Sequence, residues 1–358
     1  MCTFAQTRKY LLVKKSLFVF ECWLVQMVAS AFFPVAVPAQ ETVRLVGSGS
    51  STASKLFAAW GSEFNRRHAN VQIAYVSTTS SSGIEQISML RGDFAVGEIA
   101  LNAEPPNGGQ RGAGRTQLAA IPLAVITVVP VYNVTGRTDL RFTGELLAQI
   151  YTRKIVNWND ERIAKINPGV PLPNLPITVV ERPPGTGMRF IFTDFLMRTS
   201  PEFRHWAKNN LSGLVSQTVA EFSKDVANRV ASTPGAFGFT DTNLARQHKL
   251  AVGLVQNSSG RFVKPPSHPG IASPVGHPDL AGTQTVVSDG AADSYPITGF
   301  LWVYLPVGHT APDRGPQLYW FLDWCLTDGQ DLLTADYSAL PPVVAERARA
   351  KLRSIVQP

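Results

Sequence analysis

Cysteine is scarce in this 358-residue chain, which contains three. Cys2 and Cys22 lie within the first forty residues, and Cys325 lies alone in an apolar stretch. Once the N-terminal segment is removed, Cys325 has no partner in the chain, so an internal disulfide is excluded. Its apolar neighbours indicate a small buried side chain rather than a reactive thiol.

Charged residues are also few. Asp, Glu, Lys and Arg make up 16% of the chain, and the formal net charge is +7. Removing residues 1–39 would take away four basic residues and one acidic residue, which leaves +4. This charge is not clustered, whereas a nucleic-acid-binding surface needs a concentrated basic face. The composition therefore argues against a nucleic-acid partner, and the 28 glycines and 26 prolines suit a turn-rich α/β protein.

The sequence lacks the motifs of common hydrolases and nucleotide-binding proteins. Residues 47–51 do not have the Gly-x-Ser-x-Gly spacing of a serine hydrolase. No glycine-rich turn ends in Gly-Lys-Ser/Thr, as a Walker loop requires. His268 and His277 are candidate metal ligands, but nothing beside them has ligand spacing. The sequence thus predicts a binding protein that is not an enzyme, with no metal site and no cofactor.

The first 39 residues have the features of an export signal. Basic residues precede a largely apolar run over residues 16–33, and small residues lead up to Ala39. A retained membrane anchor is the alternative, but Glu21 and Gln26 interrupt the run and proline follows it. We therefore expect a signal peptide cleaved near Ala39 and a periplasmic or secreted protein.

The chain after residue 40 alternates strand and helix patterns. Residues 42–46 and 71–76 have strand patterns, and a helix is predicted over residues 52–67 because its apolar side chains share one face. This order predicts a parallel sheet. The other expected elements are strands over 122–131, 177–180 and 300–305, helical stretches over 146–166 (broken at 157–160), from Phe190, around Phe321 and over 343–355, and loops over 102–114 and 264–278.

Three turns between strands and helices are rich in glycine and hydroxyl side chains: residues 47–52, 78–83 and 182–187. The first N–H groups of a helix have no partner within it and carry partial positive charge, so such turns can bind anions. For any one of them alone, capping by Ser or Thr is the better explanation. Three in one chain, each after a predicted strand, favour an oxyanion site.

Two charged residues accompany these turns. Arg182 begins the third turn, and its fork of donors suits an oxyanion, although position alone fits a surface arginine or an ordinary ion pair. Glu98 follows a predicted strand. A carboxylate repels a fully ionised ligand but accepts a hydrogen bond from a protonated one, so Glu98 could separate phosphate or arsenate from sulfate. The alternative for Glu98 is a solvated loop acid.

Longer motifs occur in order through the chain. They cover residues 47–51, 80–87, 92–94, 150–155, 157–160, 164–169, 234–239, 295–298 and 336–341. Together they resemble the periplasmic phosphate-binding protein of the phosphate ABC transporter, a PstS-like solute-binding family. The resemblance implies a two-lobed α/β periplasmic-binding-protein fold, type II-like, with mixed sheets flanked by helices and the ligand cleft between the lobes. Lobe I would comprise 40–120 plus 293–358, and lobe II 121–292.

The same resemblance implies the ligand contacts. They are Ser51, Thr52, Ser80, Glu98, Arg182, Thr186, Gly187 and Met188. Glu98, Pro184 and Met188 depart from the family pattern, which has two aspartates and a threonine at these positions. Losing a hydrogen bond to a charged ligand costs roughly 1.5–3 kcal/mol, so the departures bear on ligand identity and affinity rather than on fold.

The implied function is the capture of phosphate, or a closely related protonated oxyanion, for an ABC importer whose membrane permease is the partner. We expect a monomer that closes its lobes on the ligand. The alternative is a secreted family member with an altered ligand, acting in sensing, scavenging or protein contacts rather than transport.

Overall fold

The computed structural model describes residues 42–101, 116–216, 218–266, 293–309, 313–334 and 337–356. Thr42–Pro358 forms a compact unit of its own. The expected signal peptide, the loop over 102–114 and most of the loop over 264–278 lie outside the described residues. Among the helices of the described ranges, none is long and apolar enough to cross a membrane.

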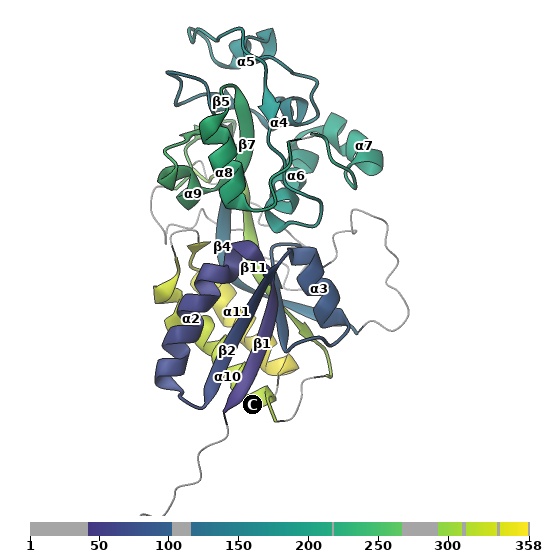
Figure 1. Ribbon diagram of the computed structural model, residues 1–358, viewed down its shortest axis with the longest axis vertical. Coiled ribbons are helices and arrows are strands. Elements are labelled where there is room, and N and C mark those ends of the chain that lie inside the picture. The colour runs from purple at the N-terminus through teal and green to yellow at the C-terminus, as the bar shows by residue number, and fades with distance from the viewer. Residues whose placement is uncertain are drawn as a thin grey trace, which may run out of the picture. The chain divides into compact units, whose positions relative to one another are not determined.

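The described strands form a sheet of nine strands and a sheet of three (Figure 1). The strands are β1 (Val43–Ser50), β2 (Val71–Thr78), β3 (Phe94–Gly97), β4 (Leu118–Tyr132), β5 (Arg141–Phe142), β6 (Thr178–Val179), β7 (Ala236–Asp241), β8 (Ala251–Val252), β9 (Leu254–Gln256), β10 (Phe262–Val263), β11 (Thr298–Pro306) and β12 (Tyr337–Ser338). The larger sheet has the order β2-β1-β3-β11-β4-β7-β6, with β8 and β12 also paired to β4, and the smaller has the order β10-β9-β5.

Helices cover these sheets. They are the 3₁₀ turns η2 (Ser51–Ala53) and η3 (Asp328–Leu332) and the α-helices α2 (Ser54–Arg67), α3 (Ser80–Ser88), α4 (Gly144–Tyr151), α5 (Glu161–Ile166), α6 (Gly187–Thr199), α7 (Pro201–Asn210), α8 (Ser223–Ser232), α9 (Thr242–Gln247), α10 (Gly315–Cys325) and α11 (Pro342–Ile355). The predicted helical stretch over 146–166 is therefore two helices, α4 and α5, and the predicted break between them is confirmed.

The larger sheet is mixed. β1 runs parallel to both β2 and β3, as the alternation of strands and helices predicts. β11 arrives from the distant C-terminal part of the chain and pairs antiparallel with β3 and β4. The expectation of a parallel sheet is thus confirmed for the first strands and wrong for the sheet as a whole, because a long-range return strand completes it.

The strand β4 connects two parts of the sheet. Its residues from Leu118 to Thr127 pair with β11, and those from Val128 to Tyr132 pair with β7. Nearly all of its side chains are buried. A strand covered on both faces has a continuous apolar sequence rather than an alternating one, which explains the long apolar run.

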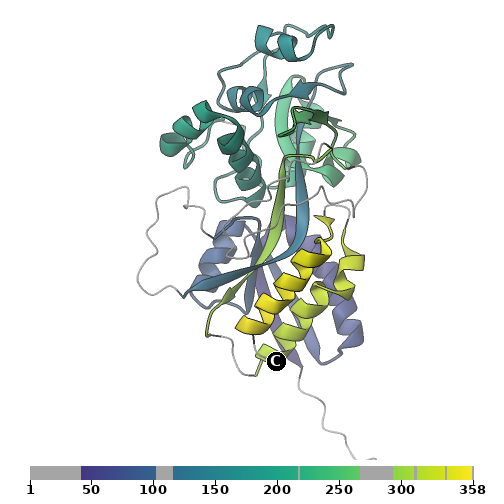
Figure 2. The same cartoon turned by 180° about the vertical axis from the view of Figure 1, so that it is seen from behind.

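The C-terminal helices complete the core that α2 begins. The ring of Phe57 on α2 contacts Phe94 of β3 and Phe321 of α10. The indole N–H of Trp60 donates to the carbonyl of Gly329 at 2.7 Å. Figure 2 shows α10 and α11 lying side by side over this part of the sheet. Cys325 of α10 is fully buried and unpaired within the described residues, which confirms its predicted role as a small core side chain.

The first hydroxyl-rich motif belongs to a strand rather than to a turn. β1 continues to Ser50, so the predicted break after Val46 is wrong. The reason is close packing across the sheet: a Cβ at Gly47 would overlap the ring of Phe94, and one at Gly49 would overlap the carbonyl of Val96. Only glycine permits this approach, and Gly49 also has a φ of +136°.

Candidate functional site

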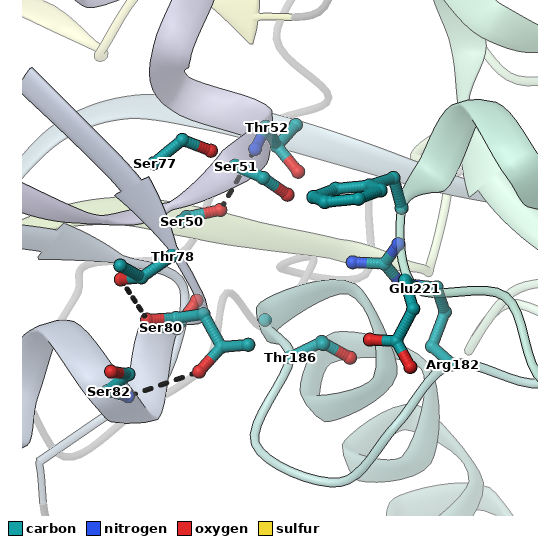
Figure 3. A pocket seen from close by; sticks show the side chains of 13 residues that line it. Ser50, Ser51, Thr52, Ser77, Thr78, Ser80, Ser82, Arg182, Thr186 and Glu221 are labelled. Carbon is teal, nitrogen blue, oxygen red and sulfur yellow. Dashed lines mark hydrogen bonds between the residues drawn. The ribbon is translucent and has the colours of Figure 1, made fainter.

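A cavity of about 380 Å³ lies where the three predicted turns meet. Its lining consists of Ser50, Ser51, Thr52, Ser77, Thr78, Thr79, Ser80, Ser82, Arg182, Thr186, Gly187, Glu221 and Phe222. Figure 3 shows hydroxyl side chains from the first two turns on one side and Arg182, Thr186 and Glu221 on the other. Six of the eight predicted site residues line the cavity; Glu98 and Met188 do not.

The first two turns use hydroxyl groups as ordinary helix caps. Ser50 Oγ accepts the N–H of Thr52 at 3.3 Å, and Thr79 Oγ1 accepts that of Ser82 at 3.2 Å. The N–H of Ser81 donates to the carbonyl of Gly185 at 3.1 Å. Several N–H groups at these termini are therefore already satisfied, and capping explains their hydroxyl-rich sequence.

The third turn differs because its helix lacks a side-chain cap. α6 begins at Gly187, and its N-cap residue Thr186 makes no capping hydrogen bond. The Thr186 hydroxyl instead donates to the carbonyl of Pro183 at 2.8 Å. The first-turn N–H groups of α6 are thus left without a capping side chain and carry the partial positive charge of a helix N-terminus. Such a terminus favours an anion.

Arg182 gives the strongest sign of an anion ligand. Its side chain is 3% exposed, and its Nε and Nη1 atoms are buried without a hydrogen-bond partner. Burial lowers the pKa of Arg182 to about 10, against the opposing effect of the Glu98, Glu221 and Asp225 charges. An unpaired buried cation is costly, so these donors favour an anionic ligand at the cavity. The surface-arginine alternative is therefore wrong.

Glu98 lies behind the wall of the cavity. It is 1% exposed, and its two carboxylate oxygens accept hydrogen bonds from Ser50 Oγ and Ser80 Oγ, each at 2.7 Å. Burial raises the pKa of Glu98, while the two serine hydrogen bonds and the charge of Arg182 oppose the rise. The solvated-loop alternative is wrong, and Glu98 reaches the cavity only through the two serines.

Two neighbours show how the departures from the family pattern are accommodated. A Cβ at Gly187 would overlap Glu98 Oε2, so the glycine provides the room that the longer glutamate needs. The side chain of Met188 is 1% exposed and packs in the hydrophobic core. Met188 therefore neither fills nor enlarges the cavity with its side chain, and only its backbone can serve a ligand.

Sequence reasoning missed Glu221 and Phe222, which line the cavity just before α8. They reach it because Val219 forms a parallel bridge to Glu181, the residue before Arg182. The N–H of Glu181 donates to Thr218, and that of Ala220 donates back to Glu181. Such a long-range pairing leaves no local motif, and the only available signal was an acidic and an aromatic residue before a helix.

A buried ionic network holds this pairing in place. Arg189 of α6 contacts Glu181 Oε1 at 3.1 Å and donates through Nε to the Tyr151 hydroxyl at 3.0 Å. The other oxygen of Glu181 accepts the N–H groups of Val215 and Ser216. The network thus fixes the strand end that carries Arg182 to α6 and to the segment leading to Glu221.

Metal ligands are not gathered in the described ranges, where no group of three or more His, Cys, Asp or Glu side chains could hold an ion. The two histidines considered from the sequence, His268 and His277, lie outside these ranges. The polar groups of the cavity are hydroxyls, helix N–H groups, one guanidinium and the exposed carboxylate of Glu221. The first three kinds are donors. This set suits an oxyanion.

Known proteins share both the sequence pattern and the fold. The pattern of the PBP superfamily domain matches residues 36–328. The phosphate-binding protein PstS of Pasteurella multocida is 27% identical over 92% of this chain and 96% of its own. PstS of Haemophilus influenzae is 28% identical over 89% of this chain and 95% of its own. A solved phosphate-binding protein from Stenotrophomonas maltophilia, 19% identical, shares the fold with a TM-score of 0.62 over 87% of this chain and 94% of its own. The chain belongs to the PBP superfamily and has the two-lobed α/β fold of its phosphate-binding members.

Proposed function

We propose that this protein is an exported solute-binding protein that captures phosphate, or a closely related protonated oxyanion, for an ABC importer. The observation that carries the proposal is the buried guanidinium of Arg182, whose unpartnered donors lie at the same cavity as the uncapped N-terminus of α6. The similarity to curated phosphate-binding proteins over about nine-tenths of the chain supports it.

The proposed ligand contacts are Ser51, Ser80 and Thr186 through their hydroxyls, Arg182 through its guanidinium, and Gly187 and Met188 through backbone N–H groups. The Ser80 and Thr186 hydroxyls already donate within the protein and would serve as acceptors. Thr52 would exchange its N–H bond to Ser50 Oγ, at 3.3 Å, for the ligand. Glu98 acts on the ligand indirectly. A serine has one O–H, and those of Ser50 and Ser80 are directed to Glu98, so the atoms left facing the cavity are acceptors. An oxyanion that keeps a proton can donate to them, whereas sulfate cannot.

The proposed role in transport also includes a division into two lobes, export from the cytoplasm and binding to a permease in the membrane. We propose lobe I from residues 40–120 plus 293–358 and lobe II from 121–292, with β4 and β11 as the crossover strands. The long shared strand β4 supports this division, because it pairs with β11 on one side of Thr127 and with β7 on the other. Cleavage of a signal peptide near Ala39 would release a periplasmic monomer, and lobe closure would present a new surface to the permease.

Calorimetric titration of the ligand-stripped protein with phosphate, with sulfate as the control, tests the function. Micromolar or tighter phosphate binding without a sulfate response is the expected result. If phosphate does not bind at millimolar concentration, the transporter role is wrong and an altered ligand takes its place. Solution scattering with and without saturating phosphate tests the closure, and unchanged dimensions would contradict it.

A further inference from the structure

The rim of the cavity has a feature that orthophosphate does not use. Glu221 and Phe222 both line the cavity and both are exposed, Phe222 by 54%. An acid beside an anion site weakens anion binding by like-charge repulsion. A large aromatic ring facing solvent at a ligand cavity is likewise unexplained by a small hydrophilic ion.

The size of the cavity points in the same direction. Orthophosphate has five heavy atoms and fills about the volume of three water molecules, each taking ~30 Å³. The cavity volume is about 380 Å³. This value lies within the range of pockets that hold small organic molecules, roughly 300–1,000 Å³. A phosphoryl group bound at Arg182 would leave room for a substituent.

The charges indicate the nature of that substituent. The negative charge of Glu221 acts on Arg182, yet the two side chains form no salt bridge, and the buried Nε and Nη1 of Arg182 have no partner. Glu221 therefore is not the counter-ion that neutralises Arg182 in this structure. A cationic group supplied by the ligand would satisfy Glu221 while an anionic group satisfied Arg182.

We propose that this cavity accepts a phosphate ester or phosphonate whose short chain carries a protonated amine, with the amine bound by Glu221 and the chain lying on Phe222. The proposal rests on the proposed function, because the phosphoryl end uses the oxyanion site described above. Arg182 and the N-terminus of α6 bind the phosphoryl end of such a ligand in its singly protonated form, whose P–OH donates to the oxygens of Ser50 and Ser80. Glu221 is then a specificity-determining residue rather than an obstacle to binding.

The experiment compares three ligands by calorimetry: orthophosphate, ethylphosphonate and 2-aminoethylphosphonate. The two phosphonates differ only in the amine. In the unmodified protein the amine should strengthen binding about twofold to fivefold, as expected for a partly exposed ion pair. Glu221→Gln should abolish this difference between the phosphonates. Glu346→Gln, which removes an exposed glutamate of α11 that does not line the cavity, should retain it.

Each outcome decides a separate point. An amine effect that is absent, or that persists in Glu221→Gln, would overturn the role of Glu221. Orthophosphate binding with neither phosphonate bound would overturn the proposal of a substituted ligand and leave the proposed function intact. Failure of all three ligands, orthophosphate included, would overturn both. Phe222→Ala should weaken both phosphonates relative to orthophosphate, and an unchanged ratio would contradict the contact with the chain.

Discussion

Arg182 and Arg189 lie seven residues apart, are both 3% exposed, and differ in their partners. Arg189 contacts Glu181, Tyr151 and the carbonyls of Leu211 and Gly213. Arg182 has two buried nitrogens without any partner. The guanidinium of Arg189 thus stabilises the turn, whereas that of Arg182 is available to a ligand.

This contrast predicts opposite effects of removing the two charges. Arg182→Met should abolish phosphate binding and stabilise the ligand-free protein, because leaving polar groups buried and unsatisfied costs roughly 1–3 kcal/mol. Arg189→Met should destabilise the protein by roughly 3–5 kcal/mol, because Glu181 is left buried and unpaired. Thermal unfolding and calorimetry of both variants measure this. A loss of stability in Arg182→Met similar to that in Arg189→Met would contradict the assignment of a ligand-binding role.

Replacing Glu98 should relax the choice of anion. In Glu98→Gln the amide group can donate to one of the two serines, which frees that hydroxyl to donate into the cavity. The variant should therefore bind sulfate, and the ratio of phosphate to sulfate affinity should fall at least about tenfold. Calorimetric titration with both anions measures the ratio. Continued rejection of sulfate would show that Glu98 does not set the selectivity.

Glu98 should also make stability depend on pH. Burial raises the pKa of Glu98 in the folded protein. In the unfolded protein a glutamate has a pKa of about 4.3, so the folded state keeps the proton to a higher pH than the unfolded state does. The stabilisation of the folded state by protonated Glu98 is complete below the pKa of the unfolded state. It is lost as the pH rises through the raised pKa of the folded state. Relative to the unmodified protein, Glu98→Gln should therefore gain free energy of unfolding as pH rises from acid to neutral. A constant difference across this range, measured by urea unfolding, would contradict the prediction.

Gly187 should not tolerate a methyl group. A Cβ there would lie 2.6 Å from Glu98 Cδ and 2.8 Å from Glu98 Cβ. Gly187→Ala should destabilise the protein by roughly 1–3 kcal/mol, as overpacking does, and should weaken phosphate binding by displacing Glu98 or α6. Gly213→Ala is the control, because the nearest atom to its added Cβ is the Asn210 carbonyl at 3.7 Å. Equal thermal shifts in the two variants would show that the contact with Glu98 is not limiting.

The local features of this protein follow from its amino-acid sequence. The apolar spacing from Leu56 to Phe64 predicts the buried face of α2, and the apolar run before Tyr132 predicts β4, because both patterns follow from backbone geometry. The hydroxyl-rich turns and the motifs through the chain indicated an oxyanion site and a family. These signals are local, so they can be recognised without knowing which segments meet.

The placement and pairing of the charged residues at the site depend on the tertiary fold. Arg182 is buried rather than at the surface, Glu98 lies behind Ser50 and Ser80 rather than in the cavity, and Glu221 enters the site from a segment with no recognisable motif. Burial and partner choice depend on contacts between residues far apart in the chain, and these contacts set whether a charge is paired, neutralised or left for a ligand. No local pattern contains that information.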